Sequence, residues 1–232
     1  MWRKVVLLGF RIMRRRRQVT AEVAERFRTL PAANVSDAMA RMSAAGARLR
    51  PMHAGGVMVG PAFTVKTRPG DNLMVHKALD LAVPGDVIVV DAGGELNNAI
   101  IGEIMTSYAE RRGIAGMVIH GAVRDIAAIR NGNFPVYAGG VTHRGPYKDG
   151  PGEINVPIAL DGMVVEPGDL VLGDDDGLVC VPFGDVESVW QTASVKKVAE
   201  EGIIAGIRAG APQDRAWIDA TLQRLGCGIE AD

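Results

Sequence analysis

The sequence predicts an α/β domain with a mixed central sheet and terminal helices. Short apolar runs at residues 87–90 and 117–119 are typical of strands that are buried on both faces. Helical patterns lie between such runs without a strict strand–helix alternation, which favours a sheet with both parallel and antiparallel pairs. The last segments, 186–201 and 213–225, have helical patterns. A chain of 232 residues can bury a substantial core.

The first 17 residues are strongly basic. They hold seven of the 26 Arg and Lys residues and no acidic residue, which leaves 19 bases against 27 acids elsewhere. Such an acidic body is a poor general binder of nucleic acid. We interpret residues 1–19 as a basic leader, either disordered or added by a start site placed upstream of Met13, and residues 20–232 as the folded domain. A nucleic-acid or membrane tail is the less favoured alternative.

Composition also bears on the cellular setting. No apolar run reaches the roughly 18 residues that a membrane-spanning helix needs. The two cysteines, Cys180 and Cys227, are too few for a disulfide framework and lack the spacing of metal ligands. We therefore expect a cytoplasmic protein without a membrane partner.

Capping and turn residues predict the elements of the first half. A helix is expected from the cap Thr20 to about Leu30, because Pro31 follows. A second short helix is expected to start at Ser36 and to turn three residues inward, Ala38, Met39 and Met42. The next predicted elements are a strand at 57–67 with an edge or bulge at Gly60-Pro61, and a helix at 71–82 capped by Asp71.

Glycine and proline residues divide the second half. A glycine loop at 93–94 precedes a predicted helix at 103–112, which ends at Gly113. After the buried strand at 117–119, the sequence predicts a helical turn at 124–130, a strand at 134–137 and an irregular loop at 139–155.

The motif Pro-Gly-Asp occurs twice, at 84–86 and 167–169, and each copy is followed by an apolar run. We interpret the two copies as similar turns that lead into strands. The acidic residues 174–176 predict a hairpin turn, because they lack the alternating spacing and terminal Glu of a calcium loop.

Residues 102–125 hold the main candidate for chemistry. A glycine and an acid, Gly102 and Glu103, begin a predicted helix, whose free N–H groups can bind an anion. A helix of about eleven residues advances roughly 16 Å, and the next strand returns about as far, so Arg124 and Asp125 should lie near Gly102. Arginine binds carboxylates, and aspartate binds Mg²⁺ or Mn²⁺, so these residues suit a 2-oxo acid, which presents a carboxylate and a neighbouring carbonyl. From spacing alone, an ordinary surface turn is the more common explanation of an Arg-Asp pair after a strand.

Asn72 and His76 are a weaker pair of candidates. They are four residues apart in a predicted helix and therefore share one face. From this pattern alone, a structural histidine is the more common explanation. The other histidines show no metal-ligand spacing.

Several segments, in their order along the chain, resemble the RraA-like family. They are G-D-N-L-M-V-H-K-A, P-G-D-V-I-V-V-D-A-G-G, G-E-I-M, G-M-V-I-H-G-A-V-R-D, F-P-V-Y and P-G-D-L-V-L-G-D-D-D-G. The resemblance covers roughly residues 20–205. Its most specific element is an acidic residue, twenty intervening residues and then Arg-Asp, here Glu103 and Arg124-Asp125.

The resemblance implies a swivelling β/β/α domain and a class II, metal-dependent pyruvate aldolase. Such an enzyme cleaves 4-hydroxy-4-methyl-2-oxoglutarate to pyruvate, and many members also decarboxylate oxaloacetate. It implies Asp125 as the ligand of Mg²⁺ (or Mn²⁺ or Co²⁺), and Arg124 with the backbone of Gly102, Glu103, Ile104 and Met105 as the holder of the substrate carboxylate. Glu103 would orient a water on the metal or the arginine, and Asn72 and His76 would lie near the substrate. His76 or a water would remove the 4-hydroxyl proton.

The resemblance also implies a homotrimer or a homohexamer with active sites between subunits. A C-terminal acid of a neighbour, Glu200 or Glu201, would then complete each site. His120 stands where many aldolase members carry Asp, and this concerns substrate preference. The same fold includes regulators that bind and inhibit an RNA-degrading endonuclease without catalysis, which is the alternative function. The complete acid–Arg–Asp set favours the enzyme. A methyltransferase label used for some members is disfavoured, because the sequence has no nucleotide-cofactor loop.

Overall fold

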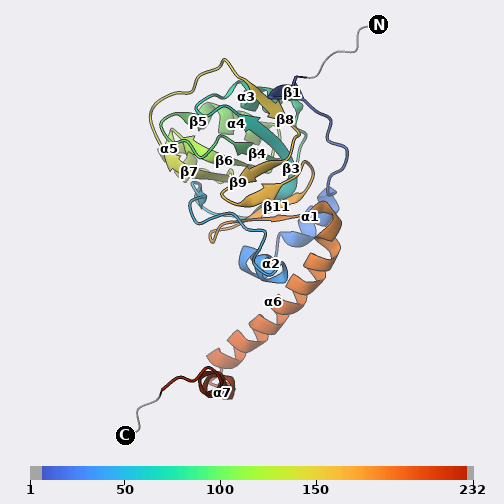
Figure 1. Cartoon of the computed structure of the whole chain (residues 1–232), viewed down its shortest axis with the longest axis vertical. Helices are drawn as coiled ribbons and strands as arrows, with labels where there is room; N and C mark the ends of the chain where they lie inside the picture. The colour runs from blue at the N-terminus through green and yellow to red at the C-terminus, as the bar shows by residue number, and fades with distance from the viewer. Residues whose placement is uncertain (1–6, 229–232) are drawn as a thin grey trace. The chain divides into compact units, whose positions relative to one another are not determined.

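The computed structural model describes residues 7–228 and has a mixed central sheet with helices around it (Figure 1). The main path of the sheet runs β1-β8-β3-β4-β6-β7-β2, with β5 joined to β6 and with β11 and β12 joined through β3. The central pairs β3–β4, β4–β6 and β6–β7 are parallel, whereas β3–β8, β3–β11 and β2–β7 are antiparallel. The predicted mixed α/β fold is confirmed.

The strands are β1 (Phe10–Ile12), β2 (Arg50–Pro51), β3 (Met58–Thr67), β4 (Val87–Asp91), β5 (Ala99–Ile101), β6 (Gly116–Val123), β7 (Val136–Val141), β8 (Gly152–Ile154), β9 (Ile158–Leu160), β10 (Met163–Val165), β11 (Leu170–Gly173) and β12 (Leu178–Val181). The α-helices are α1 (Ala21–Phe27), α2 (Ala32–Ala38), α3 (Leu73–Leu81), α4 (Glu103–Arg111), α5 (Ile126–Asn131), α6 (Val186–Arg208) and α7 (Ala216–Arg224), and a 3₁₀ turn (Phe183–Asp185) precedes α6.

The chain divides into two units, one up to Ser194 and one from Val195. In the part of the chain from 7 to 228, no helix is long and apolar enough to cross a membrane.

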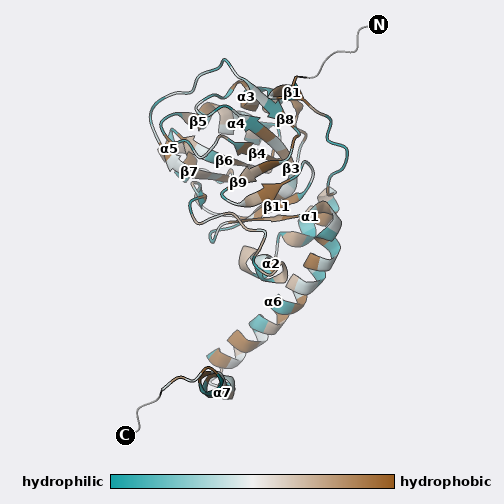
Figure 2. Ribbon diagram, viewed as in Figure 1, coloured by the Kyte–Doolittle hydropathy of each residue, from teal (hydrophilic) through white to brown (hydrophobic). Residues whose placement is uncertain are grey.

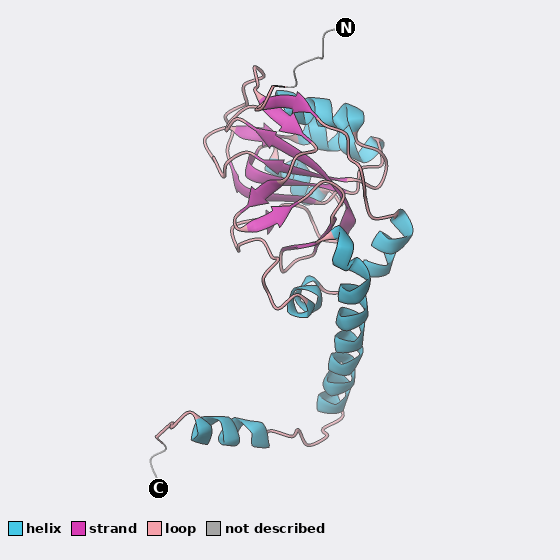
Figure 3. Ribbon diagram, turned by 45° about the vertical axis from the view of Figure 1, so that its right-hand side comes forward, coloured by secondary structure: helices cyan, strands magenta, loops and turns pink. Residues whose placement is uncertain are grey.

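The central strands are buried on both faces, as their continuous apolar sequence predicts. Val87, Ile88, Val89 and Val90 are all fully buried, and Figure 2 shows apolar residues along these strands. Successive side chains of a strand point to opposite faces, so alternate residues of β4 enter two different core clusters. One face packs on α3, α4 and α5, and the other packs on β9, β10 and β11. Figure 3 shows the same layering, which is the predicted β/β/α arrangement.

The two Pro-Gly-Asp turns are built alike. Gly85 and Gly168 have left-handed φ values of +89° and +92°. The carboxylate of Asp86 accepts the N–H of Val83 at 2.9 Å, and the carboxylate of Asp169 accepts the N–H of Glu166 at 2.9 Å. The prediction of two similar turns that lead into strands, here β4 and β11, is confirmed.

The expectation of a disordered leader is wrong for residues 7–19, while residues 1–6 lie outside the described residues. Strand β1 pairs in parallel with β8. Three arginines of this segment bind carboxylates of the body: Arg11 binds Glu153 at 2.5 Å, Arg15 binds Asp86 at 2.7 Å, and Arg17 binds Glu166 at 2.6 Å. The sequence suggested disorder because it shows the charges of the segment but not the carboxylates that neutralise them.

Other differences concern short elements. Helix α2 begins at Ala32, directly after Pro31, rather than at Ser36. It ends before Ala40 and Arg41, which have positive φ, so Met42 is exposed instead of turned inward. Strand β8 lies in the segment predicted as an irregular loop. Strand β3 is central rather than an edge, but Gly60-Pro61 pairs only with β11, because pairing with β4 begins at Ala62.

The contact of Arg15 with Asp86 should contribute strongly to stability. The two side chains are 10% and 1% exposed, and removal of the arginine leaves a buried carboxylate without its cation. We expect Arg15→Ala to lower the free energy of unfolding by about 3 kcal/mol in denaturant titration. The control is Arg16→Ala, an exposed neighbour, which should change it by less than about 0.5 kcal/mol. Equal effects of the two variants would show that the segment does not contribute through this pair.

Candidate active site

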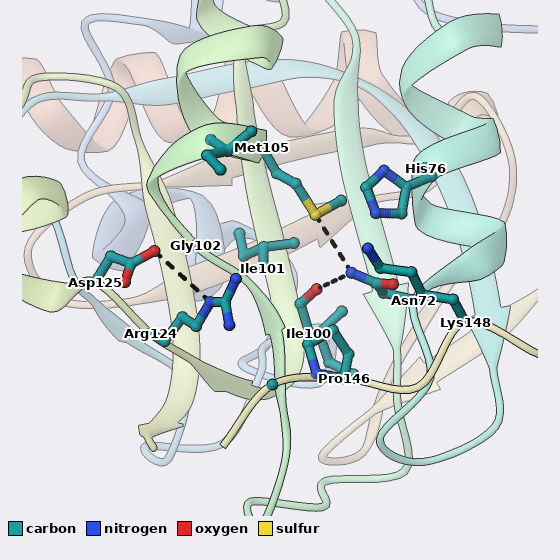
Figure 4. Close-up of a pocket in the computed structure, with 12 residues that line it drawn as sticks. Asn72, His76, Ile100, Ile101, Gly102, Met105, Arg124, Asp125, Pro146 and Lys148 are labelled. Atoms are coloured by element: carbon teal, nitrogen blue, oxygen red, sulfur yellow. Dashed lines mark hydrogen bonds and ion pairs between the residues drawn. The ribbon is translucent and has the colours of Figure 1, made fainter. Parts of the chain in front are cut away.

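A pocket of about 240 Å³ lies between the first turns of α3 and α4, the end of β6 and the loop before β8 (Figure 4). It is lined by Asn72, His76, Ile100, Ile101, Gly102, Ile104, Met105, Arg124, Asp125, Gly145, Pro146 and Lys148. The pocket therefore brings together side chains from four segments that are far apart in the sequence.

Asp125 joins the end of β6 to the start of α4. Its carboxylate Oδ2 accepts the N–H of Glu103 at 3.0 Å, so it satisfies one of the free N–H groups at this helix end. Asp125 has left-handed backbone angles, φ 55° and ψ 38°, which aspartate tolerates better than most residues do. This turn directs the carboxylate back toward α4. The predicted approach of Arg124-Asp125 to Gly102 is confirmed.

Gly102 leaves the space that Arg124 and Asp125 occupy. A Cβ atom at Gly102 would lie 2.3 Å from Oδ2 of Asp125 and 2.8 Å from Cγ of Arg124. A Cβ at Gly145 would lie 3.2 Å from Nη1 of Arg124. The arginine side chain is thus held between two glycines, with its Nε 3.7 Å from Asp125 Oδ2.

The backbone at the start of α4 offers fewer free donors than the sequence implied. The N–H of Glu103 is used by Asp125, and the N–H groups of Met105 and Thr106 bond to the carbonyl of Gly102. Among the described residues, the N–H groups of Gly102 and Ile104 are the ones in this turn that have no hydrogen-bond acceptor within the chain. An anion beside Arg124 would therefore meet at most two free backbone donors, those of Gly102 and Ile104, rather than four.

Asn72 presents an unpaired acceptor to the pocket. It is 2% exposed, and its Nδ2 donates to the carbonyl of Ile100 at 2.9 Å and to Sδ of Met105 at 3.4 Å. These bonds orient the amide, and its Oδ1 is buried without a partner among residues 7–228. A buried acceptor of this kind is costly unless a ligand or water donates to it. Figure 4 shows the amide beside His76 and Lys148.

His76 and Lys148 form the wall next to Asn72. Burial lowers the pKa of His76, the ammonium of Lys148 lowers it further, and Asp80 raises it in part. The imidazole is therefore neutral near pH 7 and can accept a proton. No sequence pattern predicts a role for Lys148, because the lysine lies in a loop that has no periodic pattern. Long-range bonds place this loop, including that from the N–H of Asn72 to the carbonyl of Tyr147 at 3.0 Å.

Glu103 lies outside the pocket. Its side chain is exposed and lines a neighbouring open hollow, which Arg124 and Asp125 also line. His120 is also absent from the pocket lining, and its Nδ1 lies 3.6 Å from a carboxylate oxygen of Asp91. Glu201, in the second unit, pairs with Lys197 on α6 at 3.1 Å. The contribution of a C-terminal acid to a neighbour's site stays a prediction.

The metal-binding groups of the pocket fit a Mg²⁺ ion that keeps several waters better than a metal ion whose ligands all come from the protein. Asp125 is the one carboxylate among the described residues that line the pocket. In the region from 7 to 228, no group of three or more His, Cys, Asp and Glu side chains is placed to hold a metal. Mg²⁺ keeps several waters and is commonly held by one or two carboxylates plus the substrate. Asp125 with a bound 2-oxo acid would supply such a set.

Comparison with known proteins identifies the family. The family model RraA-like, described as Aldolase/RraA, matches residues 32–180. The chain belongs to the RraA-like family. A Halalkalibacterium halodurans protein named "Putative 4-hydroxy-4-methyl-2-oxoglutarate aldolase" is 40% identical over 205 residues, which cover 88% of this chain and 98% of that protein.

Two solved structures share the fold. An uncharacterized protein from Pseudomonas syringae pv. tomato has a TM-score of 0.76 and 29% identity, and the match covers 84% of this chain and 96% of that one. The RNA-processing inhibitor RraA from Thermus thermophilus has a TM-score of 0.61 and 32% identity, with 66% and 92% covered.

The environment of His76 can be tested by titration. We expect NMR of the imidazole to give a pKa below the ordinary value of 6.5. Lys148→Met should raise this pKa, because a cation is removed, but the pKa should stay below 6.5, because burial is the larger cause. The folded state binds this proton less readily than the unfolded state does, so His76 should lower stability as the pH falls below 6.5. An unchanged pKa in Lys148→Met would place the ammonium away from the imidazole.

Proposed function

We propose that this protein is a divalent-metal-dependent lyase that cleaves 4-hydroxy-2-oxo acids, such as 4-hydroxy-4-methyl-2-oxoglutarate, to pyruvate, and that also decarboxylates oxaloacetate. The observation that carries the proposal is the convergence of Arg124, Asp125 and the first turn of α4 on a pocket that also holds the unpaired Asn72 oxygen. The name of the Halalkalibacterium halodurans relative supports the aldolase class.

Each of the pocket residues would bind a different group of the substrate. Arg124 and the Ile104 N–H would hold the C1 carboxylate, since a guanidinium binds carboxylates in two parallel hydrogen bonds. Asp125 would hold the cation, and Asn72 Oδ1 would accept a hydrogen bond from a hydroxyl group of the substrate. A bound Mg²⁺ would polarise the 2-oxo group and so favour movement of negative charge onto it.

His76 is the protein group best suited to take the 4-hydroxyl proton, because its lowered pKa keeps Nδ1 or Nε2 free to accept. As this proton leaves, the C3–C4 bond breaks and its electron pair moves toward the 2-oxo group. Protonation at C3 then gives pyruvate, and C4 leaves as a carbonyl compound. In oxaloacetate the same electron movement releases carbon dioxide, without a hydroxyl proton to remove.

The alternative is a non-catalytic regulator that binds an RNA-degrading endonuclease. The solved Thermus relative, named an RNA-processing inhibitor, favours it. A binding module does not require a pocket in which an arginine, a carboxylate and an unpaired buried amide oxygen converge. The site geometry therefore favours the lyase.

Pyruvate release from a panel of 4-hydroxy-2-oxo acids and oxaloacetate, with and without a chelator, tests the proposal. We expect release that stops on metal removal and returns with Mg²⁺, Mn²⁺ or Co²⁺. Release that survives full metal removal would contradict metal dependence. If no member of the panel gives pyruvate but the protein inhibits the endonuclease, the regulator is the correct function.

Variants at Arg124 and Asp125 separate their roles. Arg124→Lys keeps the charge but loses the planar fork, so kcat/KM for pyruvate release should fall about 100-fold while calorimetry shows normal metal binding. Asp125→Ala should abolish turnover and weaken metal binding. The control is Arg144→Lys, an exposed arginine outside the pocket lining, which should keep full activity. Normal metal affinity in Asp125→Ala would refute the ligand assignment.

We also expect a homotrimer or homohexamer. In the unit from Val195, helix α6 exposes apolar side chains, among them Val195, Val198, Ile203 and Ile207. Several exposed apolar side chains on one helix are typical of an interaction surface. Light scattering at micromolar concentration should give three or six chains, and Val198→Glu should reduce this number, whereas Lys197→Glu on the same helix should reduce it less. A fully active monomer would contradict a site shared between subunits.

A further inference from the structure

We propose that Asp71 is a positioning residue for substrate choice: it holds the loop that carries Lys148 against the pocket and so favours 2-oxo acids with a second carboxylate. The inference rests on the proposed function, because it concerns the same pocket. Asp71 itself is absent from the residues that line the pocket, so it would act through the loop rather than on the substrate.

The carboxylate of Asp71 is completely buried and joins two segments. Its Oδ2 accepts the N–H of Asp149 at 2.7 Å and the N–H of Gly150 at 2.9 Å. Its Oδ1 accepts the N–H of Leu73, in the first turn of α3, at 2.9 Å. Hydrogen bonds to an ionised acceptor are about twice as strong as neutral ones. Asp71 therefore fixes the loop to the helix that carries Asn72 and His76.

Both neighbours of Lys148 are fixed by this contact region. On one side, Tyr147 donates its N–H to the carbonyl of Gly70 at 2.8 Å and accepts the N–H of Asn72 at 3.0 Å. On the other side, Asp149 donates to Asp71. Lys148 is thus an exposed residue between two anchored ones, and its side chain lines the pocket beside His76 (Figure 4).

The pair of Asp71 with Arg68 contributes less than these backbone bonds. Nη2 of Arg68 lies 3.2 Å from Oδ2 of Asp71, but the arginine side chain is 45% exposed. Ion pairs open to solvent contribute little to stability. Asp71 therefore acts mainly on the backbone of the loop, and Arg68→Gln is a suitable control.

Two cations reach the pocket from different elements. Arg124 follows β6, and Lys148 lies in the loop before β8. A 2-oxo acid whose C1 carboxylate is bound by Arg124 would direct a distal carboxylate toward the wall that contains Lys148. The strength of this second contact depends on how firmly the loop is held, because a mobile lysine loses entropy when it binds. Asp71 thereby influences the preference for two carboxylates over one.

Asp71→Asn tests the inference, since an amide cannot accept all three backbone N–H groups. We expect kcat/KM for 4-hydroxy-4-methyl-2-oxoglutarate, which has two carboxylates, to fall about tenfold, mainly through KM. For 4-hydroxy-2-oxopentanoate, which has one, kcat/KM should change less than about threefold. Hydrogen exchange should be faster at the amides of Asp149 and Gly150.

The matched control is Asp169→Asn. Asp169 is also buried and also accepts two backbone N–H groups, from Glu166 and Phe183, but it lies in the turn before β11 and outside the pocket lining. Asp169→Asn and Arg68→Gln should leave unchanged the ratio of kcat/KM for the substrate with two carboxylates to kcat/KM for the substrate with one. An equal change of the ratio in Asp169→Asn would show a general loss of stability instead of positioning.

Lys148→Met tests the route by which Asp71 acts. It should lower the same ratio, and Asp71→Asn in the Lys148→Met background should lower it no further. An unchanged ratio in Lys148→Met overturns the inference even if Asp71→Asn fails to fold, and additive effects overturn it as well.

Binding without turnover separates this inference from the proposed function. Calorimetry measures the dissociation constants of 2-oxoglutarate, which has two carboxylates, and 2-oxobutanoate, which has one. Their ratio reports the preference for a second carboxylate without any turnover. If the wild-type protein releases no pyruvate, the proposed lyase is wrong, yet a loss of 2-oxoglutarate preference in Asp71→Asn would still support the positioning role. An unchanged preference would refute that role.

Discussion

The hydrogen bond from the Glu103 N–H to Oδ2 of Asp125 is the contact on which the candidate site depends. It brings the end of a central strand to the start of a helix 22 residues earlier in the chain. The contact needs a left-handed residue at Asp125 and a residue without a side chain at Gly102, since a Cβ atom there would overlap both Asp125 and Arg124. This contact positions the carboxylate of Asp125 and, next to it, the guanidinium of Arg124 at the pocket.

Buried aspartates that accept backbone N–H groups recur in this protein. Asp86 and Asp169 close the two Pro-Gly-Asp turns, and Asp71 joins α3 to the loop before β8. Each carboxylate needs several donors, because burial removes its water. The carboxylate of Asp86 also binds the guanidinium of Arg15. This ion pair holds the N-terminal segment against the turn. At Asp71 most donors come from the backbone beside the pocket. One physical requirement therefore shapes both the fold and the site.

Local patterns predicted what depends on local interactions. The buried strands β4 and β6, the helix after Gly102 and the two similar turns follow from apolar runs, caps and glycines. The approach of Arg124 to Gly102 followed from lengths alone. Strand β8 and the place of Lys148 did not, because both depend on pairing between distant segments. The basic segment at 7–19 was misjudged for the same reason: its carboxylate partners lie 71 to 149 residues away.

Under the proposed function, substrate preference would depend on the pocket walls rather than on His120. The histidine stands where many aldolase members carry aspartate, but it lies beside Asp91 and outside the pocket lining, so it would not contact a substrate bound in that pocket. The wall formed by α3 and the loop before β8 supplies Asn72, His76 and Lys148, which are an acceptor, a neutral base and a cation. In the proposed function, Arg124 would hold the carboxylate that all 2-oxo acids share, and Asp125 would hold the cation. The choice among such acids would therefore depend on the opposite wall, whose position is fixed by long-range hydrogen bonds that no sequence motif reveals.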